Sequence, residues 1–268
     1  MTIRTAYVAF ETAASPPLAV AGKLRLPARD AAALPGAAVL ICHGSDGVDG
    51  RGEYYAPALN AAGVATLEID MWAARGVARG AAARPRSPIE TLPDAFAARA
   101  FLAAQPEIDP HRIAIMGFSW GGVVTLLSAR RQDVASLGGG GPGFAAHAAF
   151  YPVCWAYSAV PALALSDLTG APMLIQTGEA DAYDAPGAGE ALAASLRASG
   201  AEIECIAYPG ATHGFDRDLP AQTINDPFAH QGAGGPVLMA FDPVAAPAAR
   251  AAVVRFFERT LNPGILKE

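Results

Sequence analysis

A serine between glycines is the residue in this sequence best placed to act as a nucleophile. Ser119 lies in the run I-A-I-M-G-F-S-W-G-G-V-V, which starts at Ile113 and contains the pattern G-x-S-x-G. The apolar residues before the pattern and the helix-like residues after it predict a strand, a sharp turn and a helix. At such a turn the serine hydroxyl is exposed at the end of a sheet, and glycines are needed because a Cβ would crowd the backbone. Ser119 is therefore the predicted nucleophile.

A nucleophilic serine needs a base and a group that orients the base, because its hydroxyl is weakly reactive near neutral pH. His213 follows a strand-like run in A-T-H-G-F, and Asp181 follows another in G-E-A-D. We predict that His213 takes the proton from Ser119 and that Asp181 holds the imidazole in the required tautomer. Asp184 competes for the acidic role, but Asp181 lies closer to the end of its strand. His43, in contrast, is expected to shape its own loop.

Acyl transfer places a negative charge on the substrate carbonyl oxygen, and backbone N–H groups can stabilise it. Trp120 directly follows Ser119 at a predicted helix N-terminus, and Ser45 lies in the loop H-G-S-D-G after an apolar strand-like run. We predict that the N–H groups of Ser45 and Trp120 form this oxyanion hole. Aromatic side chains near the predicted strand ends are candidates for substrate binding: Trp72, Tyr151, Trp155 and Phe215.

Strand-like and helix-like runs alternate along the chain, which is typical of a parallel sheet covered by helices. Strands are expected at 37–42, 64–69, 112–118, 145–151, 172–177 and 202–208, and helices at 51–62, 89–105, 120–131, 189–199 and 244–261. Runs at 5–10 and 18–26 are expected to form an antiparallel pair at one edge. Because parallel strands end at the same side of a sheet, the loops that carry the predicted site residues converge there. The whole chain, 1–268, is predicted to be one domain with about eight mostly parallel strands and helices on both faces.

Two long loops are expected, and the first of them has no clear period of hydrophobic residues. One is 70–88, rich in alanine, arginine and glycine, and the other is 216–241, which is polar, proline-rich and expected to be a surface excursion. Long loops in a compact domain usually lie near a functional opening. We expect these two loops to determine substrate specificity.

The composition is that of a globular protein and argues against several kinds of partner. Of the 268 residues, 52% are hydrophobic and 16% are charged. No apolar run is long enough to span a membrane, and the first residues lack the features of a signal peptide. Three cysteines favour reduced thiols, so a cytoplasmic location is expected. A net charge of −6 without a basic run argues against nucleic acid or an anionic membrane as a partner, and a homodimer stays possible.

The order serine, aspartate, histidine along the chain is that of the α/β-hydrolases. Within that superfamily the chain resembles the dienelactone hydrolase family over about residues 18–260. The matching motifs are H-G-S-D-G (43–47), G-F-S-W-G-G (117–122), F-Y-P (150–152), G-E-A-D…P (178–186) and A-T-H-G-F (211–215). The resemblance implies the α/β-hydrolase fold without a large lid, a mechanism that needs no metal or cofactor, and a small ester or lactone as substrate.

Two positions depart from the family pattern. The dienelactone hydrolases proper have a cysteine nucleophile where this chain has Ser119, and a glutamate where it has Gly44. These differences favour an ordinary serine esterase over lactone-specific chemistry.

Two other functions are compatible with the same residues. The pattern around Asp109, Arg112 and Ile113 is similar to the catalytic domain of prolyl oligopeptidase, which would make the chain a peptidase or amidase. A binding protein that kept the fold without catalysis is the other alternative.

Overall fold

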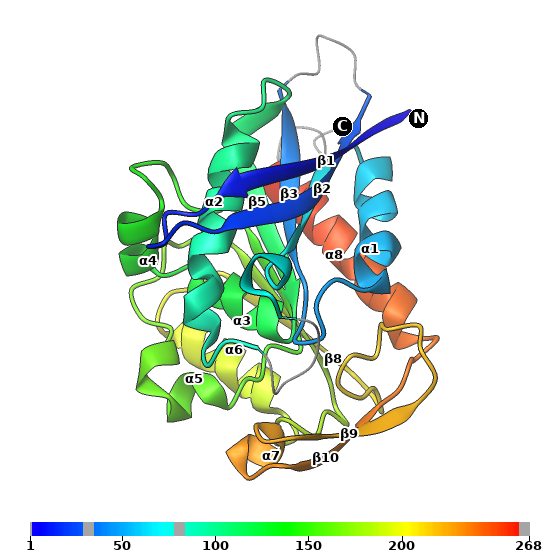
Figure 1. Cartoon of the computed structure of the whole chain (residues 1–268). Coiled ribbons are helices and arrows are strands. Elements are labelled where there is room, and N and C mark those ends of the chain that lie inside the picture. Colours follow the sequence, from blue (N-terminus) through cyan, green and yellow to red (C-terminus); the bar gives the residue numbers. More distant parts are fainter. Residues whose placement is uncertain (1, 29–34, 78–83, 263–268) are drawn as a thin grey trace.

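Eight strands form one mixed sheet through the centre of the molecule (Figure 1). The computed structural model describes residues 2–28, 35–77 and 84–262. The strands are β1 (Ile3–Glu11), β2 (Ala19–Pro27), β3 (Gly36–Cys42), β4 (Ala65–Asp70), β5 (Ile108–Phe118), β6 (His147–Phe150), β7 (Met173–Gly178) and β8 (Ile203–Tyr208). Their order across the sheet is β1-β2-β4-β3-β5-β6-β7-β8.

The directions of the strands agree with the prediction from the sequence. β1 pairs with β2, and β2 with β4, in antiparallel fashion, while the pairs from β4 to β8 are parallel. All seven residues of β3 are buried, as a strand covered on both faces requires. The mostly parallel sheet with an antiparallel edge is thus confirmed.

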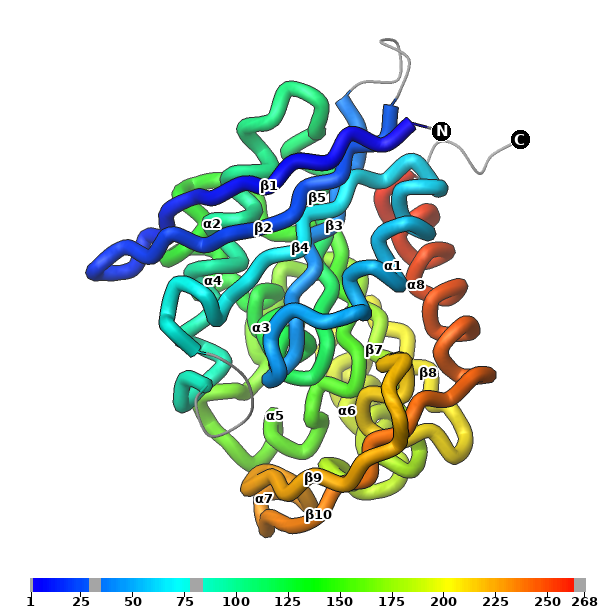
Figure 2. The backbone as a smooth tube through the Cα atoms, turned by 45° about the vertical axis from the view of Figure 1, so that its right-hand side comes forward, coloured from blue at the N-terminus to red at the C-terminus, as the bar shows by residue number. Residues whose placement is uncertain are grey.

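Helices cover both faces of this sheet (Figures 1 and 2). They are α1 (Gly50–Ala61), α2 (Leu92–Ala103), α3 (Trp120–Leu127), α4 (Arg131–Leu137), α5 (Ala156–Ala159), α6 (Ala188–Ala198), α7 (Ala229–Gly232) and α8 (Ala245–Leu261), with short 3-10 turns η2 (Ala73–Arg75), η3 (Pro88–Thr91) and η4 (Pro161–Leu163). Residues of α1 and α8 share one buried cluster with the sheet, and residues of α2, α3 and α6 share another. None of the helices in the described part of the chain has the length and hydrophobicity that crossing a bilayer needs.

Two predicted helices are shorter than their hydrophobic pattern indicated. The run 89–105 begins as η3, and its α-helix starts at Leu92, because a proline at position 93 lacks an N–H and fits only the first turn of a helix. The run 120–131 ends at Leu127, because Arg130 adopts an extended backbone and pairs with Leu168. Pairing with a distant segment was not visible in the local sequence.

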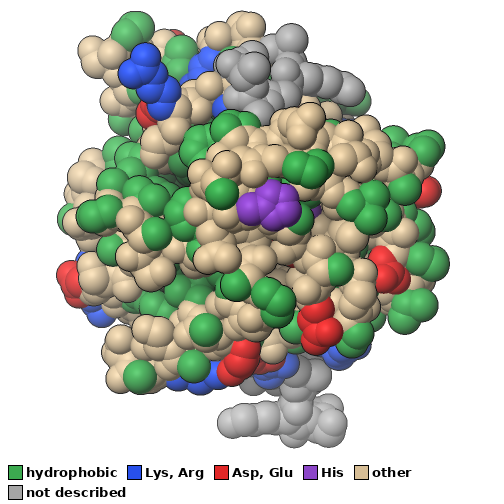
Figure 3. Space-filling view, turned by 90° about the horizontal axis from the view of Figure 1, so that it is seen from below, with side chains coloured by type: hydrophobic (Ala, Val, Ile, Leu, Met, Phe, Trp, Pro, Cys, Tyr) green, Lys and Arg blue, Asp and Glu red, His purple; other side chains and the backbone are tan. Residues whose placement is uncertain are grey.

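The stretch 216–241, which was predicted to be a surface excursion, has regular structure of its own. It contains an antiparallel hairpin of β9 (Gln222–Asp226) and β10 (Gly235–Met239), with α7 between the strands. Val237 and Met239 are buried against Tyr183, whereas Leu238 between them is exposed. Figures 1 and 2 show the hairpin below the sheet, at the end where the parallel strands stop. Figure 3 views this end, where hydrophobic side chains are spread over the surface and charged ones lie mainly toward its rim.

A buried histidine at the start of β6 links stability to pH. His147 is fully buried, and burial lowers its pKa from 6.5 to about 4. Between these two values the unfolded chain binds a proton that the folded chain does not, so stability falls as the pH falls through this window. The loss attributable to this residue reaches about 3 kcal/mol at pH 4.

Replacement of His147 by leucine is expected to remove this acid sensitivity. The free energy of unfolding should become larger in H147L than in the wild type as the pH is lowered. Between pH 6 and pH 4.5 this difference should grow by about 1.4 kcal/mol for each unit by which the pH falls. Urea denaturation of both proteins at several pH values measures this difference. Groups that titrate in both proteins, such as His43 and Glu68, cancel in the comparison. Parallel stability curves would show that His147 is not neutral in the folded protein.

Candidate active site

Ser119 occupies the turn between β5 and α3 with a strained backbone. Its φ of 51° and ψ of −109° lie outside the regions that residues with a Cβ prefer. The backbone N–H of Ser119 donates to the carbonyl of Phe150 at the end of β6, 2.9 Å away. The turn is therefore fixed to the neighbouring strand, and the serine side chain stays partly exposed beyond the sheet.

The glycines around Ser119 are required by close approach of the backbone, as the sequence indicated. A Cβ on Gly117 would lie 2.2 Å from the carbonyl oxygen of Gly121. A Cβ on Gly121 would lie 2.2 Å from the carbonyl oxygen of Cys42, at the end of β3. The first turn of α3 thus packs directly on the backbone of the central strands.

Replacement of Gly121 by alanine is expected to destabilise the protein by about 3 kcal/mol or more, since the colliding atoms are backbone and cannot move aside. Gly50→Ala is the matched control, because Gly50 is exposed and a Cβ there would meet nothing within 4 Å. That change should leave stability unaltered or slightly raised. Thermal unfolding of both variants measures the effect, and equal melting temperatures would contradict the packing described.

Three side chains from three loops form a continuous chain of hydrogen bonds at the carboxyl end of the sheet. Nε2 of His213 lies 2.9 Å from Oγ of Ser119, and Nδ1 lies 2.8 Å from Oδ2 of Asp181. Because a carboxylate only accepts, Nδ1 carries the proton and Nε2 accepts from the Ser119 hydroxyl. These distances suit proton transfer between serine and imidazole.

Packing holds this chain of side chains in place. His213 and Asp181 are both buried. The ring of His213 lies against Tyr183, with 4.2 Å between ring centres, and against Tyr151, with 4.8 Å. The other carboxylate oxygen of Asp181 accepts from the backbone N–H of Tyr183 at 2.9 Å. The imidazole therefore has little freedom to rotate.

Asp184, the competing acid, has a different position. Its two carboxylate oxygens accept from the backbone N–H groups of Cys154 and Trp155, at 2.8 and 2.7 Å. It fixes the loop after β6, whereas Asp181 is the residue that contacts the histidine.

The loop after β3 is held by His43, as predicted for a structural histidine. His43 Nδ1–H donates to the carbonyl of Gly44 at 2.8 Å, and Nε2 accepts from the backbone N–H of Met71 at 2.9 Å. Burial lowers the pKa of His43 to about 4, so the ring stays neutral with both nitrogens occupied. Trp72 donates from its indole nitrogen to the carbonyl of Ser45, 3.0 Å away. Together these bonds orient the backbone at Ser45.

The N–H groups of Ser45 and Trp120 are free to bind a ligand. Within the described residues, neither backbone N–H donates to a protein acceptor. Both residues line a cavity together with Ser119. This placement is compatible with the predicted oxyanion hole, whose role stays a prediction.

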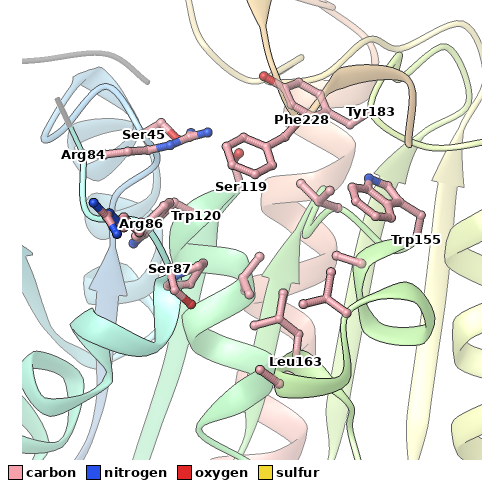
Figure 4. A pocket seen from close by; sticks show the side chains of 16 residues that line it. Ser45, Arg84, Arg86, Ser87, Ser119, Trp120, Trp155, Leu163, Tyr183 and Phe228 are labelled. Atoms are coloured by element: carbon pink, nitrogen blue, oxygen red, sulfur yellow. The ribbon is translucent and has the colours of Figure 1, made fainter. Parts of the chain in front are cut away.

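Two cavities of different chemistry meet at Ser119. The first, called the apolar cavity, has a volume of about 260 Å³ and opens beside α3 (Figure 4). Its walls are mainly hydrophobic: Val123, Val153, Trp155, Val160, Leu163 and Phe228. The second, called the polar cavity, has a volume of about 170 Å³ and is lined by His213 and by charged and amide side chains: Asp46, Arg51, Arg217, Asn225 and Asp226.

Of the four aromatic residues predicted to bind substrate, Trp155 lines the apolar cavity. The prediction is corrected for Trp72, Tyr151 and Phe215, which are fully buried and line neither cavity. They lie beneath the site because their rings fill the space between the loops and the sheet. Tyr151, for example, accepts from Arg51 at 2.9 Å and contacts the ring of His213.

The loops 70–88 and 216–241 supply residues that line the two cavities and that were not predicted from the sequence. Arg84 comes from 70–88, and Asp226 and Phe228 come from 216–241. Arg84 donates to Oγ of Ser45, lies 3.6 Å from Asp226, and stacks on Phe228 with 4.9 Å to the ring centre. The sequence signal for these residues is that their loops come after the ends of strands. Residues 78–83 of the first stretch lie outside the described residues.

A mostly parallel sheet with helices on both faces, and a strained serine between β5 and α3, define an α/β-hydrolase fold. The dienelactone hydrolase family matches residues 78–261 of the sequence, and the chain belongs to this family. It is accordingly a hydrolase of the ester-cleaving type. The fold holds no evident metal centre, since no group of three His, Cys, Asp or Glu side chains in the described residues is placed to bind an ion.

Three solved structures with the same fold are similar to this chain over nearly its whole length. A dienelactone hydrolase from Anabaena variabilis is 18% identical with a TM-score of 0.61, and the match covers 98% of this chain and 100% of that one. The dienelactone hydrolase-like promiscuous phosphotriesterase P91, from metagenomic libraries, is 19% identical with a TM-score of 0.66, covering 97% and 99%. Esterase 2 of Thermogutta terrifontis, phosphorylated by paraoxon, is 16% identical with a TM-score of 0.66, covering 98% and 96%. At these identities the likeness is one of fold, and a search of curated proteins found no match.

Proposed function

We propose that this protein hydrolyses small carboxylic esters or lactones through a covalent acyl-serine intermediate. The observation that carries the proposal is the hydrogen-bonded series Ser119, His213 and Asp181 at the junction of two cavities. A serine with this environment can attack a carbonyl carbon that lies in either cavity mouth.

In the first half of the reaction, Ser119 Oγ attacks the ester carbonyl while His213 Nε2 takes its proton. The carbonyl oxygen becomes an oxyanion, for which the N–H groups of Ser45 and Trp120 are the available donors. Collapse of this intermediate breaks the bond to the leaving oxygen, and His213 returns the proton to the alcohol. Asp181 keeps Nδ1 protonated and stabilises the imidazolium that forms in between.

In the second half, water takes the place of the alcohol. His213 removes a proton from the water, the resulting hydroxide attacks the acyl carbon, and the proton passes to Ser119 as the acid leaves. No step uses a metal or a cofactor.

A fluorophosphonate probe tests the proposal, because it reacts with a serine only when a base activates it. The structural neighbour Thermogutta terrifontis esterase 2 has been phosphorylated by paraoxon, which supports the choice of a phosphorus reagent. The probe should label the wild type at Ser119 and should fail to label S119A. Ser87→Ala, which removes another hydroxyl from the apolar cavity, should still be labelled. Folded wild-type protein that resists the probe would refute the proposal.

Amide hydrolysis is the alternative that uses the same side chains. Matched p-nitrophenyl ester and p-nitroanilide substrates with one acyl group separate the two activities. We expect the ester to be cleaved and the anilide to be left intact, whereas efficient anilide cleavage would identify a peptidase or amidase.

A further inference from the structure

The two cavities at Ser119 differ in their contact with His213. His213 is among the residues that line the polar cavity, and the described residues of the apolar cavity do not include it. Ser119 and Ser45 line both. The reacting carbonyl thus lies between a hydrophobic side and a side that holds the proton donor.

This asymmetry decides which half of an ester enters which cavity. The proton that His213 accepts from Ser119 must be delivered to the leaving oxygen, so the alcohol has to lie on the side of His213. The acyl group then extends in the other direction, past Trp120 and along α3 (Figure 4). The opposite orientation would place the leaving oxygen on the side away from His213, which holds the proton to be delivered.

The charges of the polar cavity are paired, which bears on the kind of alcohol it can hold. Arg217 lies 2.9 Å from Asp46, and Arg51 lies 2.7 Å from Asp49. Asp226 faces Arg84 at 3.6 Å and is hydrogen-bonded by the hydroxyl of Tyr183. A charged alcohol would have to break one of these pairs. A neutral alcohol with several hydroxyls can instead donate to the carboxylates and accept from the guanidinium groups.

The volumes limit the size of both halves. An engineered cavity of about 150 Å³ holds benzene, which has six non-hydrogen atoms. By that ratio the polar cavity of about 170 Å³ takes a group the size of glycerol. The apolar cavity of about 260 Å³ takes roughly ten non-hydrogen atoms, enough for a medium-length acyl chain.

We propose, on the basis of the function proposed above, that the substrates are esters of an apolar medium-length acid with a small neutral polyol of about glycerol size. The acyl chain occupies the apolar cavity beside Val160 and Leu163, and the polyol occupies the polar cavity beside Asn225 and Arg217. Hydrolysis consumes one water and releases the free acid and the polyol.

The test for the alcohol compares two octanoates of nearly equal shape. Glyceryl 1-octanoate and 2-methylbutyl octanoate differ only in the two free hydroxyls of the alcohol. We expect kcat/KM to be at least about tenfold higher for the glyceryl ester, since each hydroxyl finds partners in the polar cavity. Asn225→Leu, in the wall of the polar cavity, should lower the ratio of kcat/KM for the glyceryl ester to that for the 2-methylbutyl ester severalfold.

The test for the acyl group keeps glycerol constant. Glyceryl 1-octanoate should exceed glyceryl 1-acetate in kcat/KM by at least about 100-fold, because six further methylenes become buried. Val160→Trp, at a half-buried position in the wall of the apolar cavity, should abolish this preference for octanoate over acetate.

Labelling by the fluorophosphonate probe is measured in parallel for every variant. A protein that is labelled but prefers the 2-methylbutyl ester would overturn the assignment of the two cavities and leave the proposed function intact. The same conclusion would follow if N225L changed the preference for the acyl group, or if V160W changed the preference for the alcohol. A protein that is folded but not labelled would instead refute the proposed function itself.

Discussion

Replacement of Ser119 by alanine is expected to lower kcat for ester hydrolysis about 10⁶-fold. The hydroxyl 2.9 Å from His213 is the atom that would form the acyl bond, so its loss removes the covalent route entirely. The remaining activity would come from substrate binding and the oxyanion donors alone. KM should change little, because the walls of both cavities are intact. Initial rates with a p-nitrophenyl ester at saturating concentration measure the effect.

The fold of S119A can be checked independently. The strained backbone at position 119 is held by the bond to Phe150 and by the close packing of Gly117 and Gly121, and none of these involves the serine hydroxyl. The melting temperature should therefore match that of the wild type within a few degrees. A variant that keeps more than about one hundredth of the wild-type rate would mean that another group is the nucleophile.

Replacement of Asp181 by asparagine is expected to lower kcat about 10⁴-fold, with the geometry of the site almost unchanged. An asparagine amide can donate to Nδ1 of His213, which favours the tautomer with the proton on Nε2. That tautomer cannot accept the proton of Ser119. The variant also loses the negative charge that stabilises the imidazolium. Presteady-state measurement of acyl-serine formation reports the step directly.

Asp184→Asn is the matched control, since it makes the same chemical change three residues further along the chain. Asp184 accepts from the backbone N–H groups of Cys154 and Trp155, whereas the hydrogen bond to Nδ1 of His213 comes from Asp181. An asparagine keeps one acceptor oxygen there, so kcat should fall less than about tenfold. A larger loss in D184N than in D181N would show that Asp184 supports the base, and equal losses would contradict the assignment of this role to Asp181 alone.

The residues proposed for catalysis could be found from the sequence because each has a local signal. The glycines around Ser119 leave no room for a side chain, because a Cβ on Gly117 or on Gly121 would lie 2.2 Å from a backbone oxygen. Asp181 follows β7 and His213 follows β8, and these strands run parallel, so that they end on the same side of the sheet. Chain order and strand direction were therefore enough to predict that these side chains meet, and the structure brings them within hydrogen-bond distance.

Short-range patterns in the sequence were enough to predict the mostly parallel sheet, the strained serine turn and the candidates for acid and base. Only the tertiary structure decided which aromatic side chains are exposed to a ligand: Trp155 lines a cavity while Trp72 is buried beneath the loop of Ser45. It also decided that β9 and β10 form a hairpin next to the site. Cavity walls are assembled from side chains far apart in the chain, and a hydrophobic residue has the same local pattern whether it faces the core or a cavity.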